Sequence, residues 1–429
     1  MIMQTNTQTK ATNIPWLGDI PEGWEVRRLK NSVKLNQSNA KSNDLKIALE
    51  NIESWTGKFI QSENKFEGEG VEFEKEDVLF GKLRPYLAKV LIPKSDGWCV
   101  NEILVLKPNT EIISQKFLYL ILSNSSFINI VDSSTYGSKM PRASWDFIGS
   151  IFIPLPPLQT QTAIVEFLDK KMAKISELVS NKKKLIELLQ EQKKSLIYEA
   201  VTGKIKIGND CEITNNNSKP SGIPWLGDIP EGWKVNKLKK IGKSITGLTY
   251  DPKEIITDID SGILVLRSSN VQNGKITLDN NVFVSKEIPK NLLVKKGDIL
   301  ICSRNGSINL IGKCAVIDEV SENMTFGAFM TIFRSEYNKY LRYFFNSDLF
   351  KQQMSVCFTT TINQLTIGIL NEMLIPLPPI PTQTAIVEYL DSKTAKINQT
   401  ISTIEQELEL IEEYKKSLIY QAVTGKIEI

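Results

Sequence analysis

The sequence predicts an α+β protein in which two related α/β heads, placed about a pseudo-two-fold axis, are joined by two long antiparallel coiled-coil helices. Three observations support this fold class. The chain of 429 residues repeats itself, short β-like runs bounded by Gly, Pro and Asn fill most of each copy, and a long helical pattern ends each copy. The expected order is head one (14–157), a first spacer helix (158–207), a linker (208–222), head two (223–379) and a second spacer helix (380–429).

The repeat is defined by blocks of near-identical sequence at both ends of each copy. Residues 14–24 read IPWLGDIPEGW, and residues 223–233 read the same. A second block reads IPLPPLQTQTAIVEFLD from Ile153 and IPLPPIPTQTAIVEYLD from Ile375, and near the end of each copy KKSLIYEAVTGKI returns as KKSLIYQAVTGKI. The middles diverge strongly, so we expect a common frame that holds two different heads.

Traces of one scaffold remain inside the divergent heads. The fragment KEDVLFGKLRPYLAKV, from Lys75, parallels KKGDILICSRNGSINLIGKCAVID, from Lys295, as an acidic turn, an apolar strand, a basic polar loop and another strand. The stretch 51–58 likewise parallels 270–275. Four tryptophans lie inside the identical first blocks, so we expect them to pack the start of each head rather than to stack on bases: Trp16, Trp24, Trp225 and Trp233.

Apolar residues at seven-residue spacing predict a coiled-coil helix at the end of each copy. In the first copy the column is interrupted at Lys182 and consists of Leu168, Ile175, Leu189 and Leu196, with Leu178 and Leu185 between them. In the second copy it is unbroken and consists of Leu390, Ile397, Ile404, Ile411 and Leu418, flanked by Ile401 and Leu408. We expect helices over 159–201 and 381–423, ended by left-handed glycines at Gly203 and Gly425.

The order of elements predicts how the helices pair. Head one precedes the first helix and head two follows it, so a second helix that packs on the first must run back toward head one. The pair is therefore antiparallel, and the two ends of the chain return to one neighbourhood. The polar segment GNDCEITNNNSKPSG, 208–222, is typical of a surface linker.

Composition excludes several kinds of chemistry. The chain has no histidine, so a Ser/His/Asp or Cys/His triad and a His-based zinc site cannot be built. Its five cysteines are widely spaced without a CxxC, which favours inert thiols in a reducing cytoplasm. We expect no metal, no cofactor and no membrane association. The net charge of +3 leaves a nucleic-acid partner open, because basic groups can be clustered.

The repeated W-L-G-x-I-P-x-G-W block and the repeated (I)PLPP-x-x-x-Q-x-x-I-V-x-x-L-D helix start resemble the specificity (S) subunit of type I restriction-modification enzymes. The resemblance covers essentially the whole chain. It implies that each head is a target recognition domain that reads one half of a split double-stranded DNA sequence, and that the two helices set the spacer between the halves.

The resemblance also implies the partners. Two modification (methyltransferase) subunits bind the shared regions, and restriction (translocase-nuclease) subunits join through that core complex. The chain itself is then non-catalytic. Because the heads differ in sequence, we expect an asymmetric bipartite target whose halves lie about one turn of duplex apart, roughly 34 Å.

Two loops in each head are candidates for DNA contacts, because guanidinium groups suit guanine, amides suit adenine, and ammonium or hydroxyl groups suit phosphates. In head one the first loop offers Lys82, Arg84, Tyr86 and Lys89, and the second offers Ser138, Lys139 and Arg142. In head two the first loop offers Arg304, Asn305, Ser307, Asn309 and Lys313, and the second offers Thr360, Thr361, Asn363 and Gln364.

Two other functions remain to be weighed. A DNA amino-methyltransferase needs an Asn/Asp-Pro-Pro-aromatic motif and a Gly-rich cofactor loop, and an ATP-driven translocase needs a G-x-x-x-x-G-K-S/T loop. The sequence contains none of these motifs. A coiled-coil adaptor that binds only proteins, without direct base readout, is the remaining alternative.

Overall fold

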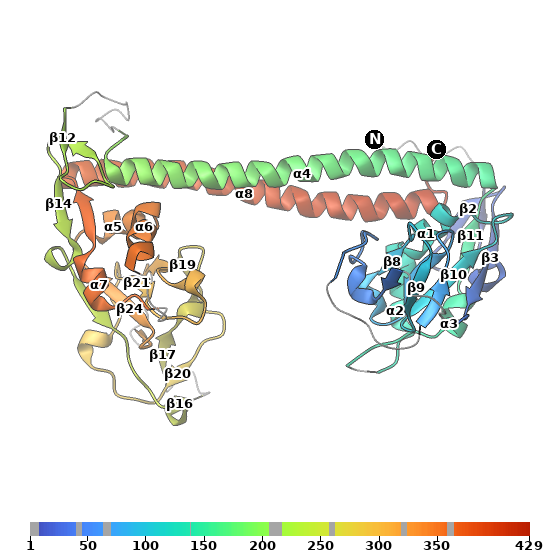
Figure 1. Cartoon of the computed structure of the whole chain (residues 1–429), viewed down its shortest axis with the longest axis horizontal. Helices are drawn as coiled ribbons and strands as arrows, with labels where there is room; N and C mark the ends of the chain where they lie inside the picture. Colours follow the sequence, from blue (N-terminus) through green and yellow to red (C-terminus); the bar gives the residue numbers. More distant parts are fainter. Residues whose placement is uncertain are drawn as a thin grey trace. The chain divides into compact units, whose positions relative to one another are not determined.

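The computed structural model of the chain describes residues 8–39, 45–62, 70–137, 139–205, 217–256, 262–318, 324–357 and 364–429. It contains two compact units (Figure 1). Unit 1 comprises Met1–Lys183 and Ile404–Ile429, and unit 2 comprises Lys184–Thr403. Each unit therefore contains one head, the first part of the helix that follows this head, and the last part of the helix from the other copy.

Head one is built on a four-stranded antiparallel sheet in the order β4 (Val33–Asn36), β10 (Ile103–Pro108), β7 (Val78–Gly81) and β8 (Val90–Leu91). A second sheet has the order β5 (Leu45–Ile47), β9 (Gly97–Val100) and β6 (Gly70–Phe73), with β5 and β9 parallel. Two strand pairs complete the β structure: β1 (Thr9–Ala11) with β2 (Asp19–Pro21), and β3 (Glu25–Arg28) with β11 (Phe152–Leu155). The helices are α1 (Gln115–Leu122), α2 (Ser125–Ser133) and α3 (Trp145–Ser150).

Head two repeats this plan. Its antiparallel sheet has the order β15 (Lys243–Thr246), β24 (Met330–Arg334), β21 (Ile299–Cys302) and β22 (Cys314–Val316). A second sheet has the order β16 (Ile255–Ile256), β20 (Phe283–Val284), β17 (Ile263–Leu266) and β23 (Met324–Phe326). The pairs are β12 (Ser218–Pro220) with β13 (Asp228–Pro230), β14 (Lys234–Lys237) with β25 (Leu374–Leu377), and β18 (Val271–Gln272) with β19 (Lys275–Ile276). The helices are α5 (Asn338–Phe345), α6 (Asp348–Cys357) and α7 (Ile367–Glu372).

The predicted parallels between the divergent heads are confirmed. The strands β7 and β8 of head one correspond in sheet order to β21 and β22 of head two. The side chain of Asn51 accepts a hydrogen bond from the Ala48 backbone at 2.8 Å, and Asn270 accepts one from the Arg267 backbone at 3.0 Å. A buried amide also holds the start of each long helix, because Gln161 donates to the Pro156 carbonyl and Gln383 to the Pro378 carbonyl.

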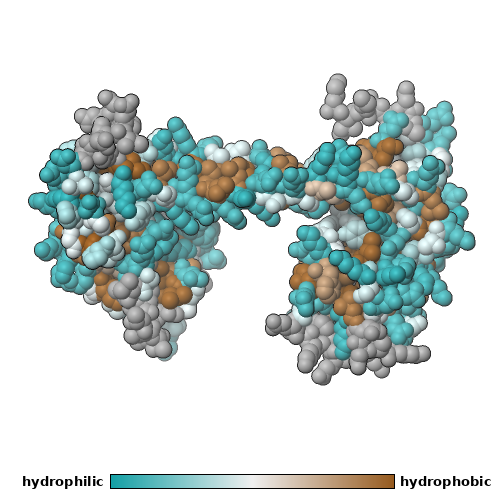
Figure 2. Space-filling model, turned by 45° about the horizontal axis from the view of Figure 1, so that its top comes forward, coloured by the Kyte–Doolittle hydropathy of each residue, from teal (hydrophilic) through white to brown (hydrophobic). Residues whose placement is uncertain are grey.

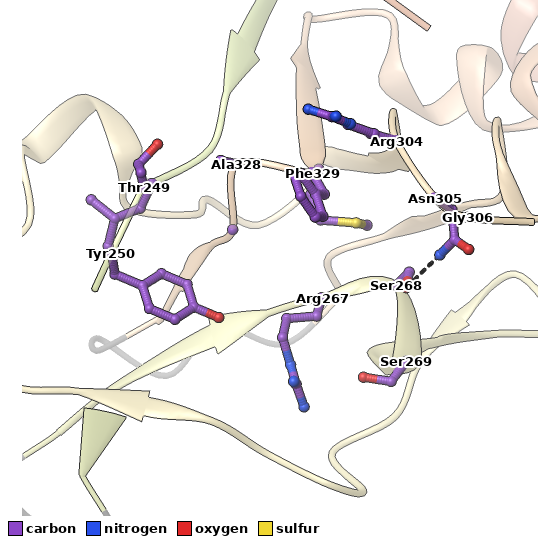
Figure 3. Close-up of a pocket in the computed structure, with 13 residues that line it drawn as sticks. Thr249, Tyr250, Arg267, Ser268, Ser269, Arg304, Asn305, Gly306, Ala328 and Phe329 are labelled. Atoms are coloured by element: carbon purple, nitrogen blue, oxygen red, sulfur yellow. Dashed lines mark hydrogen bonds between the residues drawn. The ribbon is translucent and has the colours of Figure 1, made fainter. Parts of the chain in front are cut away.

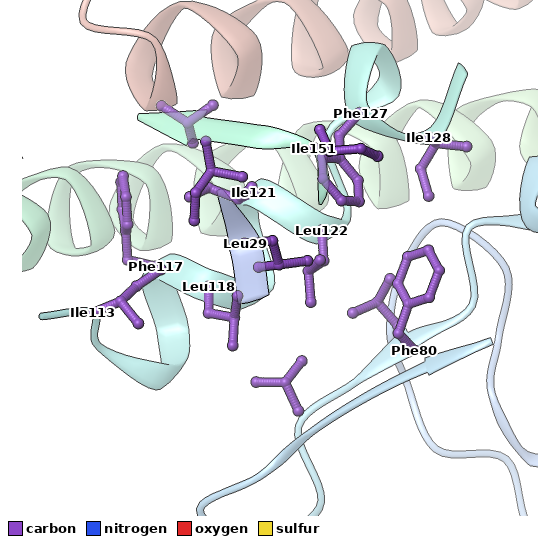
Figure 4. Packing of buried hydrophobic residues seen from close by; sticks show 14 of the residues in the cluster. Leu29, Phe80, Ile113, Phe117, Leu118, Ile121, Leu122, Phe127, Ile128 and Ile151 are labelled. Atoms are coloured by element: carbon purple, nitrogen blue, oxygen red, sulfur yellow. The ribbon is translucent and has the colours of Figure 1, made fainter. Parts of the chain in front are cut away.

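Each head packs its sheet against its short helices. In unit 1 the core includes Phe80 from β7, Phe117 and Leu118 from α1, and Phe127 from α2, all essentially inaccessible to solvent (Figure 4). The ring of Phe127 meets the ring of Phe80 edge on. Because these residues are apolar at helical or alternating spacing, burying them fixes the faces of both the helices and the sheet.

The two long helices are α4 (Leu158–Thr202) and α8 (Ile380–Val423), drawn green and red in Figure 1. Both match the predicted ranges to within one residue. As predicted, Gly203 and Gly425 end them with left-handed backbone, at φ +74° and +68°. No helix in the described part of the chain combines the length and apolar character needed to cross a membrane.

The predicted seven-residue columns line the inner faces of these helices, with one correction. Leu178 and Leu185 are each 45% exposed, so they do not belong to the seam of α4. The half-buried second column is instead Met172, Val179 and Ile186. On a helix, a residue four positions after a column residue lies on one side of the column, and a residue three positions after it lies on the other side. The partner helix packs on the first of these sides, so Val179 is half-buried and Leu178 is exposed. Hydrophobic side chains also reach the surface, and Figure 2 shows hydrophobic patches on the visible face of the helices.

The helices run antiparallel in each unit. In unit 1, Lys182 of α4 forms a 2.6 Å ion pair with Glu407 of α8. In unit 2, the Lys193 ammonium donates to the side chain of Asn398 at 2.8 Å. Lys182 sits in the predicted break of the apolar column, where Glu407 compensates its charge.

Each repeated first block packs on the end of the helix from the other copy. In unit 1, the hydroxyl of Tyr420 in α8 donates to the Trp16 carbonyl at 3.1 Å, and the Lys426 ammonium donates to the Leu17 carbonyl at 2.9 Å. A Cβ on Gly425 would lie 2.5 Å from Pro21, so this close approach requires glycine. In unit 2, Gly203 meets Pro230 in the same way. The first block and the last helix of the chain therefore meet within unit 1, as predicted.

The four repeated tryptophans do not share one environment. Trp16, Trp24 and Trp233 are buried, as predicted, whereas Trp225 is 42% exposed and so packs only in part. The Trp16 indole N–H donates to the Phe152 carbonyl at 3.1 Å. At the equivalent place in head two, the Gln353 amide donates to the Leu374 carbonyl at 2.8 Å. The head-two carbonyl that corresponds to the acceptor of Trp16 is thus already hydrogen-bonded to Gln353.

This difference gives a matched pair of stability tests. Replacing Trp16 by Ala should destabilise unit 1 by about 3–5 kcal/mol, because the change removes a buried indole. Trp225→Ala should cost about 1 kcal/mol or less, because much of its ring already faces solvent. Heat-induced unfolding of the full chain, followed by circular dichroism, measures both. Equal decreases in the unfolding temperature of the two variants would contradict the difference in burial between Trp16 and Trp225.

Candidate nucleic-acid interface

Three segments of head one meet beyond the end of β7. The Lys82 backbone N–H donates to the Glu102 carbonyl in the β9–β10 turn at 3.0 Å, and the Lys82 carbonyl accepts from the Ala143 N–H at 3.0 Å. Leu83 and Arg142 form an isolated β-bridge. The first predicted loop, the β9–β10 turn and the second predicted loop are thereby held together by backbone hydrogen bonds.

Head two builds the same junction. The Ser303 carbonyl accepts from the Leu365 N–H at 2.8 Å, and the Ser303 N–H donates to the Phe329 carbonyl at 3.0 Å. Arg304 and Gln364 form the equivalent isolated bridge. Because backbone atoms make these contacts, the junction tolerates different side chains, and the two heads do carry different ones.

In head one the junction carries an ion pair. The Arg142 guanidinium donates through Nε and Nη2 to the Glu102 carboxylate, with a shortest distance of 2.7 Å. Hydrogen bonding to Glu102, and then its charge, raise the pKa of Arg142. The carboxylate occupies one edge of the planar guanidinium, so the Nη1–Nη2 edge is held in a fixed orientation.

In head two the junction carries a stacked arginine. The Arg304 guanidinium lies over the ring of Phe329 at 5.1 Å, and Phe329 is itself 57% exposed (Figure 3). The neighbouring Asn305 donates from its amide to the Ser268 hydroxyl at 3.2 Å. Stacking orients the guanidinium without neutralising its charge.

The other predicted residues of head one lie in two environments. Arg84 and Lys139 are exposed, and Tyr86 is 46% exposed. Arg84 adopts left-handed backbone at φ +51° and its N–H donates to the Pro141 carbonyl at 2.7 Å, so it also ties the two loops together. Lys89 instead turns inward, where its ammonium donates to the Leu49 carbonyl at 2.5 Å and burial lowers its pKa.

The remaining predicted residues of head two follow the junction less closely. Ser307 and Asn309 are exposed in the loop after β21, and Lys313 is half-buried just before β22. Gln364 is half-buried beside Arg304. Four predicted residues lie outside the described residues: Ser138, Thr360, Thr361 and Asn363.

Sequence reasoning missed Glu102 and Phe329 at these junctions, and it missed Arg267 beside the junction of head two. Glu102 lies in the turn between β9 and β10, before α1. Phe329 lies in the corresponding turn between β23 and β24, before α5. Arg267 directly precedes the short 3-10 helix Ser268–Asn270. One signal was available: Asn270 repeats Asn51, so the residue three positions earlier is Arg267 in one copy and Ala48 in the other.

Comparison with known proteins places the chain in a family. The model of the type I restriction modification DNA specificity domain matches twice, over residues 21–188 and 230–410. The chain is 26% identical to the MjaVIII specificity subunit of Methanocaldococcus jannaschii, over 96% of this chain and 94% of that protein. It is 28% identical to the EcoKI specificity subunit of Escherichia coli K12, in an alignment that covers 47% of this chain and 44% of that protein.

Two solved structures share the fold. One comes from a study of complex assembly and conformational transition of the type I R-M system, with a TM-score of 0.74, 18% identity, and coverage of 95% of this chain and 99% of the other. The other is the HsdS subunit of Thermoanaerobacter tengcongensis, with a TM-score of 0.55, 18% identity, and coverage of 95% and 98%. With two matched domains, two long helices and this shared fold, the chain belongs to the type I restriction modification DNA specificity family.

Proposed function

We propose that the chain is the sequence-specific DNA-recognition subunit of a type I restriction-modification complex. Each head, residues 14–157 and 223–379, reads one half of an asymmetric bipartite target in double-stranded DNA. The observation that carries this proposal is the junction found in both heads. Its backbone hydrogen bonds recur, while its side chains change from the Glu102–Arg142 pair to Arg304 stacked on Phe329. A constant frame with different polar groups suits two readers of different half-sites.

The long helices have a mechanical role in this proposal. The spacer helices, 158–207 and 380–429, set the number of unread base pairs between the half-sites. The segment 208–222 links the two copies. Together with the repeated blocks, the helices dock two methyltransferase subunits, and restriction subunits join through that core.

Chemistry belongs to the partner subunits in this proposal. The chain contributes no catalytic residue and no cofactor, and it works in the cytoplasm. The predicted loop residues divide the work of binding. Exposed groups such as Arg84, Lys139 and Asn309 are placed to meet phosphates or base edges. The oriented groups Arg142 and Arg304 are suited to base readout, because a fixed guanidinium can match the two acceptors of guanine.

The proposal is tested with the purified complex of this chain and its methyltransferase. A pool of random duplexes, selected by electrophoretic mobility shift, should yield a two-part motif with a fixed spacer. Retention without sequence preference would instead fit a coiled-coil adaptor and would sink the proposal.

A matched pair of variants refines this test. Arg142→Gln should weaken binding of the selected duplex roughly 5- to 150-fold, which is the effect of losing one base contact of about 1–3 kcal/mol. Arg27→Gln is the control, because Arg27 also forms an ion pair with a glutamate, Glu25 at 2.8 Å, but lies on β3. Competition binding measures both. Equal losses for the two variants would remove Arg142 from the interface.

A further inference from the structure

Head two contains a pocket that the predicted loops only partly cover. Its volume is about 1100 Å³, and it is lined by four separate segments (Figure 3). The lining residues are Leu248, Thr249, Tyr250, Arg267, Ser268, Ser269, Arg304, Asn305, Gly306, Gly327, Ala328, Phe329 and Met330. We call this the head-two pocket.

The head-two pocket is positively charged. Arg267 and Arg304 both line it, and none of the described residues in its lining carries a carboxylate. Arg267 donates from Nη2 to the Asn280 carbonyl at 2.8 Å. Its Nε is buried and has no hydrogen-bond partner within the described part of the chain. A buried donor without an acceptor is unfavourable, and an incoming acceptor relieves this.

The walls of the pocket are held together by backbone hydrogen bonds between segments far apart in the sequence. The Leu248 N–H donates to the Phe326 carbonyl at 2.7 Å, and the Gly327 N–H donates to the Leu266 carbonyl at 3.0 Å. A Cβ on Gly247 would lie 2.2 Å from the Gly327 carbonyl oxygen, so glycine is needed for this approach. The hydrogen bond from Asn305 to Ser268 joins the loop that carries Arg304 to the segment that carries Arg267. The two guanidinium groups are therefore preorganised relative to each other.

The same position in head one has no charge. Ala48 and Arg267 make the same backbone hydrogen bond to the asparagine three residues later, so they are structural equivalents. The local hydrogen bonding at this position is the same in both heads, but only head two has an arginine there. This pattern fits a role in what head two recognises, since the frame itself does not need the guanidinium.

We infer that Arg267 reads a guanine in the half-site of head two, beside the contact made by Arg304. The inference rests on the proposed DNA-recognition function. Guanine presents two acceptors, N7 and O6, in the major groove, and a guanidinium can donate to both. Adenine and cytosine present an amino donor there, for which neither guanidinium offers an acceptor.

The test uses the complex with the methyltransferase and the selected duplex. Arg267→Lys keeps the charge but removes the fork, so it should weaken binding of the selected duplex roughly 5- to 150-fold. The loss should disappear when one particular G·C pair of the head-two half-site is replaced, because wild type then loses the same contact. Arg267→Gln should act at the same position. Lys290→Ala, an exposed cation outside the lining, is the control and should change nothing.

The outcomes separate cleanly. A uniform loss on all duplexes, including unrelated ones, would assign Arg267 to a phosphate and overturn the inference. Unchanged binding by both Arg267 variants would also overturn it. A variant complex that still discriminates between base pairs in the half-site of head one is folded. If wild type itself shows no sequence preference, the proposed function fails; if wild type discriminates and the variants match it, only the reading by Arg267 fails.

Discussion

Removing residues 184–190 and 400–406 together is expected to shorten the spacer of the DNA target by up to about three base pairs and to leave both half-sites unchanged. Seven helical residues span about 10 Å at about 1.5 Å per residue, and a base pair rises by about 3.4 Å. One heptad leaves the seam in register. The deleted segments lie between the Lys182–Glu407 and Lys193–Asn398 contacts, so both contacts can persist. Genome-wide mapping of methylated bases in cells that carry the variant measures the spacer.

A variant with substitutions that keep the length of the helices provides the control for this deletion. Exposed residues of the deleted α4 segment, Lys184, Glu187 and Gln190, are replaced by alanine, and the spacer should stay as in wild type. Altered half-sites with an unchanged spacer in the deletion variant would refute the idea that the helices act as a ruler. A change in both would show that the heads and helices do not act separately.

Exchanging residues 25–152 for the head of another specificity subunit is expected to replace one half-site completely. The exchanged segment starts at β3 and ends at the first residue of β11, whose pairing uses backbone hydrogen bonds. The first block and the end of α8, which complete unit 1, remain native. The incoming head must supply apolar residues at the positions of Phe127 and Ile128, which pack in the same cluster as Trp16.

Methylated-base mapping again provides the measurement. The matched exchange of 234–374 should change the other half-site alone, because these residues are the corresponding segment of the second copy. A combined exchange should change both halves and keep the spacer. If either single exchange changes both halves, the heads are not independent readers.

The periodicity of apolar residues predicted the two long helices correctly, but it predicted less well which of their side chains are buried. The seven-residue columns and the two glycine stops located α4 and α8 because they depend on local geometry. Leu178 and Leu185 were misplaced because leucine is the more conspicuous apolar residue, whereas the seam uses Met172, Val179 and Ile186. Which side of a helix becomes the seam depends on its partner, and a single helix pattern does not contain that information.

Tertiary contacts explain what the sequence could not reveal about the site. The loops that carry Arg142 and Arg304 were predicted from their polarity, and the structure brings both to the junction. Glu102 was missed because it lies 40 residues from Arg142 and meets it only through the folded sheet. Trp225 shows the same limit in another form, because an identical block has a different environment once Gln353 occupies the available carbonyl.

The packing of the first block on the last helix also has a consequence for how the protein is made. The core of unit 1 contains Leu418, Ala422 and Val423 beside Trp16 and Leu17. On the ribosome, head one is complete long before these residues exist. At about 5–20 residues per second, the remaining chain takes roughly 10–50 s to synthesise. Throughout that interval the part of the first block that packs on Leu418, Ala422 and Val423 lacks its native partner, so unit 1 is completed only once the end of α8 has been made.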